Sequence, residues 1–255
     1  MVDKKISILD HLDELRRSVI ISAIAVLIGA AICFNYAYPI LNILKKPAGN
    51  IDLIFVNVLD PFMIKFKIAI FAGIFVALPV IIYQVFSFIA PALKRNEKKT
   101  IYPMVLLFVI LFACGVVFGY KYIMPAGTEW LLGQAEGQIS PILMVDKYVA
   151  YASLFLLAFG ISFETPFFVL ALVMLGIVSP KSLRKNWRIA YIIILLFAAI
   201  VTPDWSPVTM TIFAAPMILL YEFSIVLAWW YKKLKKKKKE DLTEGGVELD
   251  TTSDG

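Results

Sequence analysis

Residues 148–177 read YVAYASLFLLAFGISFETPFFVLALVMLGI and decide the class of fold. The stretch contains no lysine or arginine, and its one acidic residue is Glu164. A helix needs about 20 predominantly apolar residues to cross roughly 30 Å of bilayer hydrocarbon, and this run exceeds that length. The sequence therefore predicts a membrane-spanning helix that is long enough to be tilted.

Five further apolar runs flank this one and are also candidate spans. They lie at residues 18–38, 65–89, 101–124, 188–203 and 208–231. The run at 188–203 is short, because only residues 189–201 are apolar before a turn signal at Thr202, Pro203 and Asp204. We predict an all-α integral membrane protein with six transmembrane helices, of which the fifth and sixth are short and thin the bilayer locally.

Composition supports a membrane protein. Of the 255 residues 60% are hydrophobic and only 17% are charged, which excludes disordered, nucleic-acid-binding and ordinary soluble proteins despite the net charge of +6. Cys33 and Cys114 lie inside apolar runs and imply no disulfide framework. With His11 as the single histidine, we expect no metal site and no cofactor.

Pro79, inside the second run, is expected to kink that helix and give the bundle a concave face.

The basic residues predict the orientation of the chain. Successive loops between the predicted spans lie on alternate sides of the membrane, and 19 of the 25 lysines and arginines then lie on one side. The positive-inside rule makes this side cytoplasmic. Both termini are then cytoplasmic, and the first span stays as an anchor. We divide the chain into an N-terminal arm (1–17), a membrane domain (18–231) and a tail (232–255). The tail begins with a lysine cluster suited to anionic lipid and ends in an acidic stretch expected to be disordered.

Two acids lie within predicted spans, where an ionised carboxylate costs at least about 2.5 kcal/mol. Glu164 is either a protonated acid bonded inside the bundle or a polar site that a substrate or partner helix reaches. Glu222 lies six residues after Pro216, which can open the helix, and either pairs with a neighbouring span or serves function.

Glu14 and Glu97 are acids surrounded by basic residues on the predicted cytoplasmic side. Local ion pairing explains both: Glu14 could pair with Arg17 or Ser18 one turn on, or with Lys98 across the fold. An exposed pair of that kind contributes about 0–1 kcal/mol.

Several motifs in a fixed order resemble those of the TatC family. They are HLDELRR (11–17), DPFMIKFK (60–67), LPVIIYQVFSFIAPALKRNEKK (78–99), GYKYIMP (119–125), FGISFETP (159–166), TPDWSP (202–207) and PMILLYEFSI (216–225). The resemblance runs from about Ile8 to Trp229. It departs from the family pattern at Asp60, where glutamate is more usual, at Ser18, where a basic residue is common, and in TPDW, which is one proline short.

The resemblance implies that the chain is the signal-peptide receptor and core subunit of a twin-arginine translocase, which exports folded proteins. Glu14 and Glu97 would then hold the paired arginines of the signal peptide. Bidentate, charge-assisted bonds explain why arginines are preferred to lysines there. Further residues would orient these acids (Arg16, Lys94 and Arg95) or form an apolar shelf beside Glu97 (Phe88, Pro91 and Leu93).

The resemblance also implies partners, namely TatA- and TatB-like single-span subunits, with Glu164 and Glu222 as intramembrane docking positions. Folded cargo cannot pass through one chain of this size, so homo- and hetero-oligomers are expected in the bacterial cytoplasmic (inner) membrane. The chain has no phosphate-binding loop, which favours transport driven by the proton motive force and not an enzyme. One alternative is a proton-coupled small-solute transporter that uses Glu164. Another is an intramembrane enzyme, for which no Ser/His or paired-Asp arrangement lies within the spans.

Overall fold

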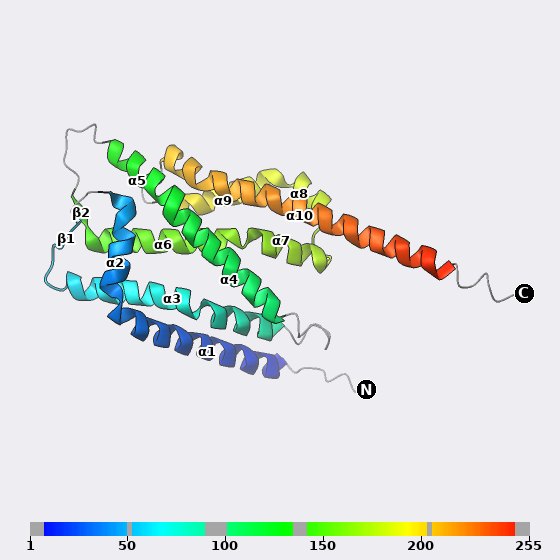
Figure 1. Ribbon diagram of the computed structural model, residues 1–255, viewed down its shortest axis with the longest axis horizontal. Helices are drawn as coiled ribbons and strands as arrows, with labels where there is room; N and C mark the ends of the chain where they lie inside the picture. The colour runs from blue at the N-terminus through cyan, green and yellow to red at the C-terminus, as the bar shows by residue number, and fades with distance from the viewer. Residues whose placement is uncertain (1–7, 50–52, 90–100, 135–141, 203–205, 248–255) are drawn as a thin grey trace, which may run out of the picture. The chain divides into compact units, whose positions relative to one another are not determined.

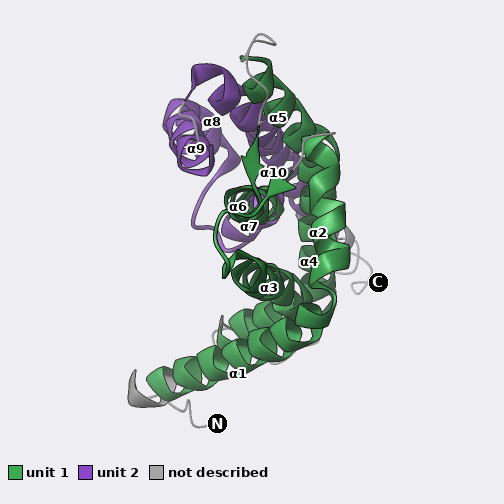
Figure 2. Ribbon diagram, turned by 90° about the vertical axis from the view of Figure 1, so that its left-hand side faces the viewer, with its two compact units in different colours: residues 1–161 green, residues 162–255 purple. Residues whose placement is uncertain are grey.

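The computed structural model describes residues 8–49, 53–89, 101–134, 142–202 and 206–247. Nearly all of these residues are helical, as the sequence predicts (Figure 1). The chain forms two compact units, residues 1–161 and residues 162–255 (Figure 2).

Unit 1 consists of long apolar helices joined by short segments. Its elements are α1 (Ile8–Asn35), α2 (Ala37–Lys45), the 3₁₀ turn η1 (Lys46–Ala48), β1 (Leu53–Ile54), α3 (Asp60–Ile89), α4 (Ile101–Phe118), the π-helical turn η4 (Gly119–Ile123), α5 (Met124–Gly133), β2 (Leu143–Met144) and α6 (Val145–Phe163), which continues two residues into unit 2. Strands β1 and β2 form one parallel pair, with Leu53 opposite Leu143.

Helices α1 and α3 lie side by side along much of their length (Figure 1). Glycines allow the backbones to touch: a Cβ added at Gly29 would lie 2.8 Å from the carbonyl oxygen of Gly73, and one added at Gly73 would lie 2.5 Å from the nitrogen of Ala30. Both distances are shorter than a side chain tolerates, so only glycine fits at this crossing.

Helix α6 carries much of the core of unit 1. Val149, Ala152 and Phe155 are completely buried, and the rings of Phe155 and Phe159 lie 4.9 Å apart. Near its start, α6 joins a cluster of buried residues from α2, α3 and α6, formed by Ala37, Leu41, Ile64, Ile68, Val145 and Val149. This helix is therefore the apolar centre of the unit.

Polar contacts fix the short helix α2 against the rest of unit 1. The hydroxyl of Tyr148 donates to the carbonyl of Leu44 at 2.7 Å, and the hydroxyl of Tyr120 donates to the carbonyl of Ile43 at 2.8 Å. The last carbonyls of a helix lack full partners within it, so Tyr148 supplies a donor to Leu44, and Tyr120 adds a second donor to the Ile43 carbonyl, which also accepts from the backbone nitrogen of Lys46. An ion pair between Lys67 and Asp146 joins α3 to α6 at the same end.

Unit 2 contains α7 (Thr165–Met174), α8 (Pro180–Lys185), α9 (Trp187–Val201) and α10 (Pro207–Val247). Helix α10 packs against the other three. Ser179 caps α8 by accepting from the backbone nitrogen of Ser182 at 3.1 Å. The hydroxyl of Tyr221 donates to the carbonyl of Leu183 at 2.9 Å and ties α10 to α8.

Five helical stretches among the described residues are long and apolar enough to cross a membrane. They are Leu12–Asn35, Asp60–Phe88, Tyr102–Gly133, Val145–Met174 and Pro207–Lys235. The predicted fifth span is α9, whose 15 residues reach only about 22 Å at 1.5 Å per residue. The prediction of several membrane-length helices is confirmed, and α9 is short as expected.

Two expectations differ from the structure. The sixth predicted span is not short, because the candidate span within α10, Pro207–Lys235, covers 29 residues. Helix α10 also continues to Val247, where the sequence suggested that the tail was disordered after residue 239. Lysine, glutamate and leucine are good helix formers, so a helix already started can propagate through this polar segment.

Candidate functional site

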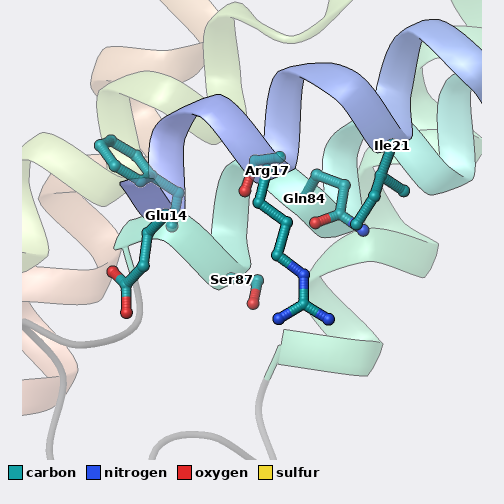
Figure 3. A pocket seen from close by; sticks show the side chains of 7 residues that line it. Glu14, Arg17, Ile21, Gln84 and Ser87 are labelled. Carbon is teal, nitrogen blue, oxygen red and sulfur yellow. The ribbon is translucent and has the colours of Figure 1, made fainter. Parts of the chain in front are cut away.

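A pocket opens between the first part of α1 and the last part of α3, both in unit 1 (Figure 3). Its volume is about 290 Å³. It is lined by Glu14, Arg17, Ser18, Ile21, Gln84, Ser87 and Phe88. The set combines one carboxylate, one guanidinium, two hydroxyls and an amide, so the pocket can bind charged and hydrogen-bonding groups of either polarity.

The α1–α3 crossing explains why these residues meet. The contact of Gly29 with Gly73 lies in the last third of α1 and near the middle of α3, and the pocket brings Glu14 to Ser87. Moving towards the start of α1 therefore means moving towards the end of α3, so the two helices are antiparallel. Gln84 and Ser87 are three residues apart and lie on one face of α3, towards α1.

Figure 3 shows how the charged groups of the pocket are arranged. The side chains of Glu14 and Arg17 leave the same side of α1, and the hydroxyl of Ser87 lies between their ends in this view. Both charged residues are exposed, whereas Ser18 and Gln84 are half-buried. The pocket therefore presents its charges and the hydroxyl of Ser87 to the surroundings, whereas Ser18 and Gln84 are less exposed.

Of the residues predicted to bind a signal peptide, Glu14 and Phe88 line this pocket. Arg16 is exposed on α1 and lines a neighbouring hollow with Asp13. The others, Pro91, Leu93, Lys94, Arg95 and Glu97, lie outside the described residues. The convergence of Glu14 with Glu97 therefore stays a prediction.

Sequence reasoning did not single out Gln84 and Ser87, although both lie in a motif that it used. Polar residues three apart near the end of an otherwise apolar helix were the available signal, since such a pair shares one helix face. The structure was needed to show that α1 packs against this face and that both residues therefore line the pocket.

Glu164 lies at the junction of α6 and α7 and has no exposed surface. The helix is interrupted there: Pro166 follows within the first turn of α7, and the Thr165 hydroxyl donates to the carbonyl of Ser162 at 2.7 Å. The predicted fourth span is therefore two helical segments with an acid between them. Its role in docking stays a prediction.

Glu222 is bonded within unit 2. Its Oε2 accepts from Nη1 of Arg184 at 2.5 Å, and its Oε1 accepts from the hydroxyl of Tyr191 at 2.8 Å. The carboxylate thus joins α8, α9 and α10. Of the two roles that the sequence left open for Glu222, pairing with neighbouring helices is the one for which the structure contains contacts.

No cluster of three or more potential metal ligands (His, Cys, Asp or Glu) occurs in the described ranges. Cys33 and Cys114 are both free thiols, the first buried and the second exposed.

The fold and the pocket define a multi-span helical membrane protein with a charged site at the end of two of its spans. The family profile described as Sec-independent protein translocase protein (TatC) matches residues 10–216. The chain therefore belongs to the TatC family, whose members are transport proteins of the Sec-independent translocase.

Individual relatives agree with this assignment. The TatC of Carboxydothermus hydrogenoformans is 40% identical over 230 residues, covering 89% of this chain and 95% of that protein. The TatC of Aquifex aeolicus is 38% identical over 224 residues, covering 86% and 92%. A crystal structure described as the twin-arginine translocase receptor TatC superposes with a TM-score of 0.78 at 36% identity, covering 86% of this chain and 98% of that one.

Proposed function

We propose that this chain is the signal-peptide receptor and core subunit of a twin-arginine translocase, which exports folded proteins. Membership of the TatC family supports the proposal, as does similarity to a structure described as the twin-arginine translocase receptor. The observation that carries it is the exposed carboxylate of Glu14 in the pocket between α1 and α3.

The chemistry of the pocket suits an arginine ligand. A guanidinium presents its donors as a rigid fork and binds a carboxylate through two parallel hydrogen bonds, whereas a lysine ammonium supplies a point charge. In the proposal Glu14 holds one guanidinium of the pair, and Glu97 holds the other. Ser87 and Gln84 add acceptors beside Glu14 for the remaining N–H groups.

Neighbouring residues complete the proposed receptor. Phe88 lines the pocket and, with Leu93, supplies apolar surface for the residues that follow the two arginines. The basic residues Arg16, Lys94 and Arg95 keep the acids oriented and discourage nonspecific cations. Charged residues around a recognition site commonly act in this way on specificity more than on affinity.

We further propose the arrangement in the membrane. Helix α9 is a sixth crossing in a locally thinned bilayer, and both termini are cytoplasmic because the basic loops lie on that side. The arm (1–17) and the tail (232–255) then flank a membrane domain (18–231) with a concave face for the signal. The host membrane is the bacterial cytoplasmic (inner) membrane.

The proposed partners are TatA- and TatB-like single-span subunits, which assemble with several copies of this chain. Glu164 is proposed as a docking position because it is an acid between α6 and α7 within a membrane-length stretch, and acids at such positions commonly serve function. Glu222 supports the same edge indirectly by holding α8, α9 and α10 together. The proton motive force drives transport, and the chain itself is not an enzyme.

The test is binding of a fluorescent twin-arginine peptide to the full chain in lipid nanodiscs. We expect saturable binding that weakens at least about tenfold when the peptide arginines become lysines, and similarly in Glu14→Ala and Glu97→Ala chains. Glu129→Ala removes an exposed acid on α5 and is the matched control. Affinity that is the same for the lysine peptide and for both variants would contradict the receptor function.

A further inference from the structure

A second hollow continues from the pocket of Glu14 along the same two helices. It has a volume of about 430 Å³ and shares Ser18, Gln84 and Phe88 with the polar pocket. Its other lining residues are mostly aliphatic, for example Val26 and Ile81. A charged pocket therefore opens directly into an apolar groove.

The dimensions of the groove match one leaflet of a bilayer. On α1 it extends from Leu15 to Val26, about 16 Å at 1.5 Å per residue. The hydrocarbon core of a bilayer is about 30 Å thick, so one leaflet is about 15 Å deep. Both helices are of membrane-spanning length and composition, and the polar pocket lies at the end of both.

The charges of the pocket specify the headgroup. Glu14 and Arg17 are three residues apart on one helix face, where neighbouring Cβ atoms are about 5–6 Å apart. A phosphoethanolamine group carries a phosphate and a primary ammonium joined by two methylene groups, a comparable spacing. A guanidinium binds phosphate through two hydrogen bonds, and an ammonium donates to a carboxylate. The headgroup thus has one charge for each charge of the pocket.

We propose that the pocket and groove together bind one molecule of phosphatidylethanolamine. Its phosphate binds Arg17 and the hydroxyl of Ser87, its ammonium binds Glu14, and an acyl chain lies along the groove. A phosphatidylglycerol headgroup offers Glu14 no cation, and the quaternary ammonium of phosphatidylcholine has no N–H to donate. This site requires only the described residues of α1 and α3. Because it uses Glu14, as the proposed receptor site does, the lipid and a twin-arginine peptide would occupy the pocket in turn.

Native mass spectrometry of the full chain in mild detergent tests the proposal, with the three lipids supplied at equal concentration and with identical acyl chains. We expect phosphatidylethanolamine to be retained about tenfold more strongly than the other two lipids, the scale of one charge-assisted contact. Arg17→Gln and Glu14→Gln should each remove this preference. Arg188→Gln, which changes an exposed arginine at the start of α9, should leave it intact.

A second variant tests the groove without touching the charges. Ala23 lines the groove and is exposed, so Ala23→Trp should fill it and weaken retention of all three lipids. Thermal unfolding of each variant checks that it remains folded. Equal retention of the three lipids, or retention that is unchanged in Arg17→Gln and Ala23→Trp, would overturn the proposal. So would crosslinking that shows the apolar part of a twin-arginine peptide in the groove while lipid retention is unaffected.

Discussion

Two acids in different parts of the molecule illustrate two uses of a carboxylate at a membrane. Glu14, on α1 of unit 1, is exposed and lines a pocket. Glu222, on α10 of unit 2, is held by Arg184 and Tyr191. The first arrangement places a charge on the lining of a pocket, and the second uses the charge to connect three helices. We propose that the first acid binds a ligand because it lines a pocket, whereas the second stabilises the packing of unit 2.

The pocket of Glu14 depends on the contact between Gly29 and Gly73, so a substitution at this contact is expected to have the largest effect on stability. Gly73→Leu places side-chain atoms where the backbone of Ala30 lies 2.5 Å from a Cβ. We expect the free energy of unfolding to fall by about 3 kcal/mol, the upper range for overpacking, and the pocket of Glu14 to be disrupted. Equilibrium unfolding of the full chain in detergent measures the first effect, and peptide binding measures the second.

Gly133→Ala is the control for that change, because a Cβ at Gly133 meets nothing within 4 Å. It should leave stability within about 0.5 kcal/mol of the parent chain. If Gly73→Leu behaved like this control, the close approach of α1 and α3 would not be what forms the pocket.

The contacts that Glu222 makes in unit 2 can be disrupted at its ion pair with Arg184. Arg184→Ala removes the cation that lies 2.5 Å from Glu222. Because the Arg184 side chain is 61% exposed and that of Glu222 is 32% exposed, we expect a loss of only about 1 kcal/mol. A double-mutant cycle with Glu222→Gln isolates the coupling between the two residues, and Lys181→Ala on the same helix is the control. A coupling near zero would mean that the pair does not hold α8 to α10.

Tyr191→Phe sharpens the same comparison by removing one hydroxyl and nothing else. The hydroxyl donates to Glu222 at 2.8 Å, and its loss should cost about 0.5 kcal/mol, since the bond is only partly shielded from water. Unfolding measurements on the variant, alone and combined with Arg184→Ala, test whether the two donors act on one carboxylate. Strictly additive losses would contradict a shared acceptor.

The smallest effect on stability is expected for a substitution of Glu14. Glu14→Gln changes an exposed side chain, so the free energy of unfolding should change by less than about 0.5 kcal/mol. Binding of the twin-arginine peptide should nevertheless weaken about tenfold. This opposite pattern, with function lost and stability kept, distinguishes a ligand-binding acid from a connecting one. A large loss of stability here would place Glu14 in the same class as Glu222.

Hydrophobic run length predicted much of the fold. The helices on either side of Glu164 and the helix that contains Pro79 follow from continuous apolar stretches, and the short α9 follows from the turn signal near Thr202. The break between α6 and α7 was not predicted, because Thr165 and Pro166 also fit the first turn of a continuing helix. The helical start of the tail was not predicted either, since a polar composition alone does not reveal propagation from an existing helix.

Fewer features of the candidate site than of the fold could be predicted from the sequence. Glu14 and Phe88 were found through motif resemblance, but the roles of Arg17 and Gln84 in one pocket depend on how α1 and α3 are registered. A helical pattern gives the face on which a residue lies, not the partner that this face meets. The same limit applied to Glu222, whose partner Arg184 is 38 positions away in the sequence.

The glycine crossing also gives α1 and α3 a mechanical property. Glu14 is 15 residues from Gly29, so the pocket lies at the end of an arm about 22 Å long, measured from the point where the backbones touch. With the contact as a fulcrum, a change of about 5° in the crossing angle would move the arm's end by about 2 Å at that helix length. Rotations too small to disturb the packing at Gly73 would thus widen or narrow the opening of the Glu14 pocket beside Ser87. The change in width would exceed half the length of a hydrogen bond.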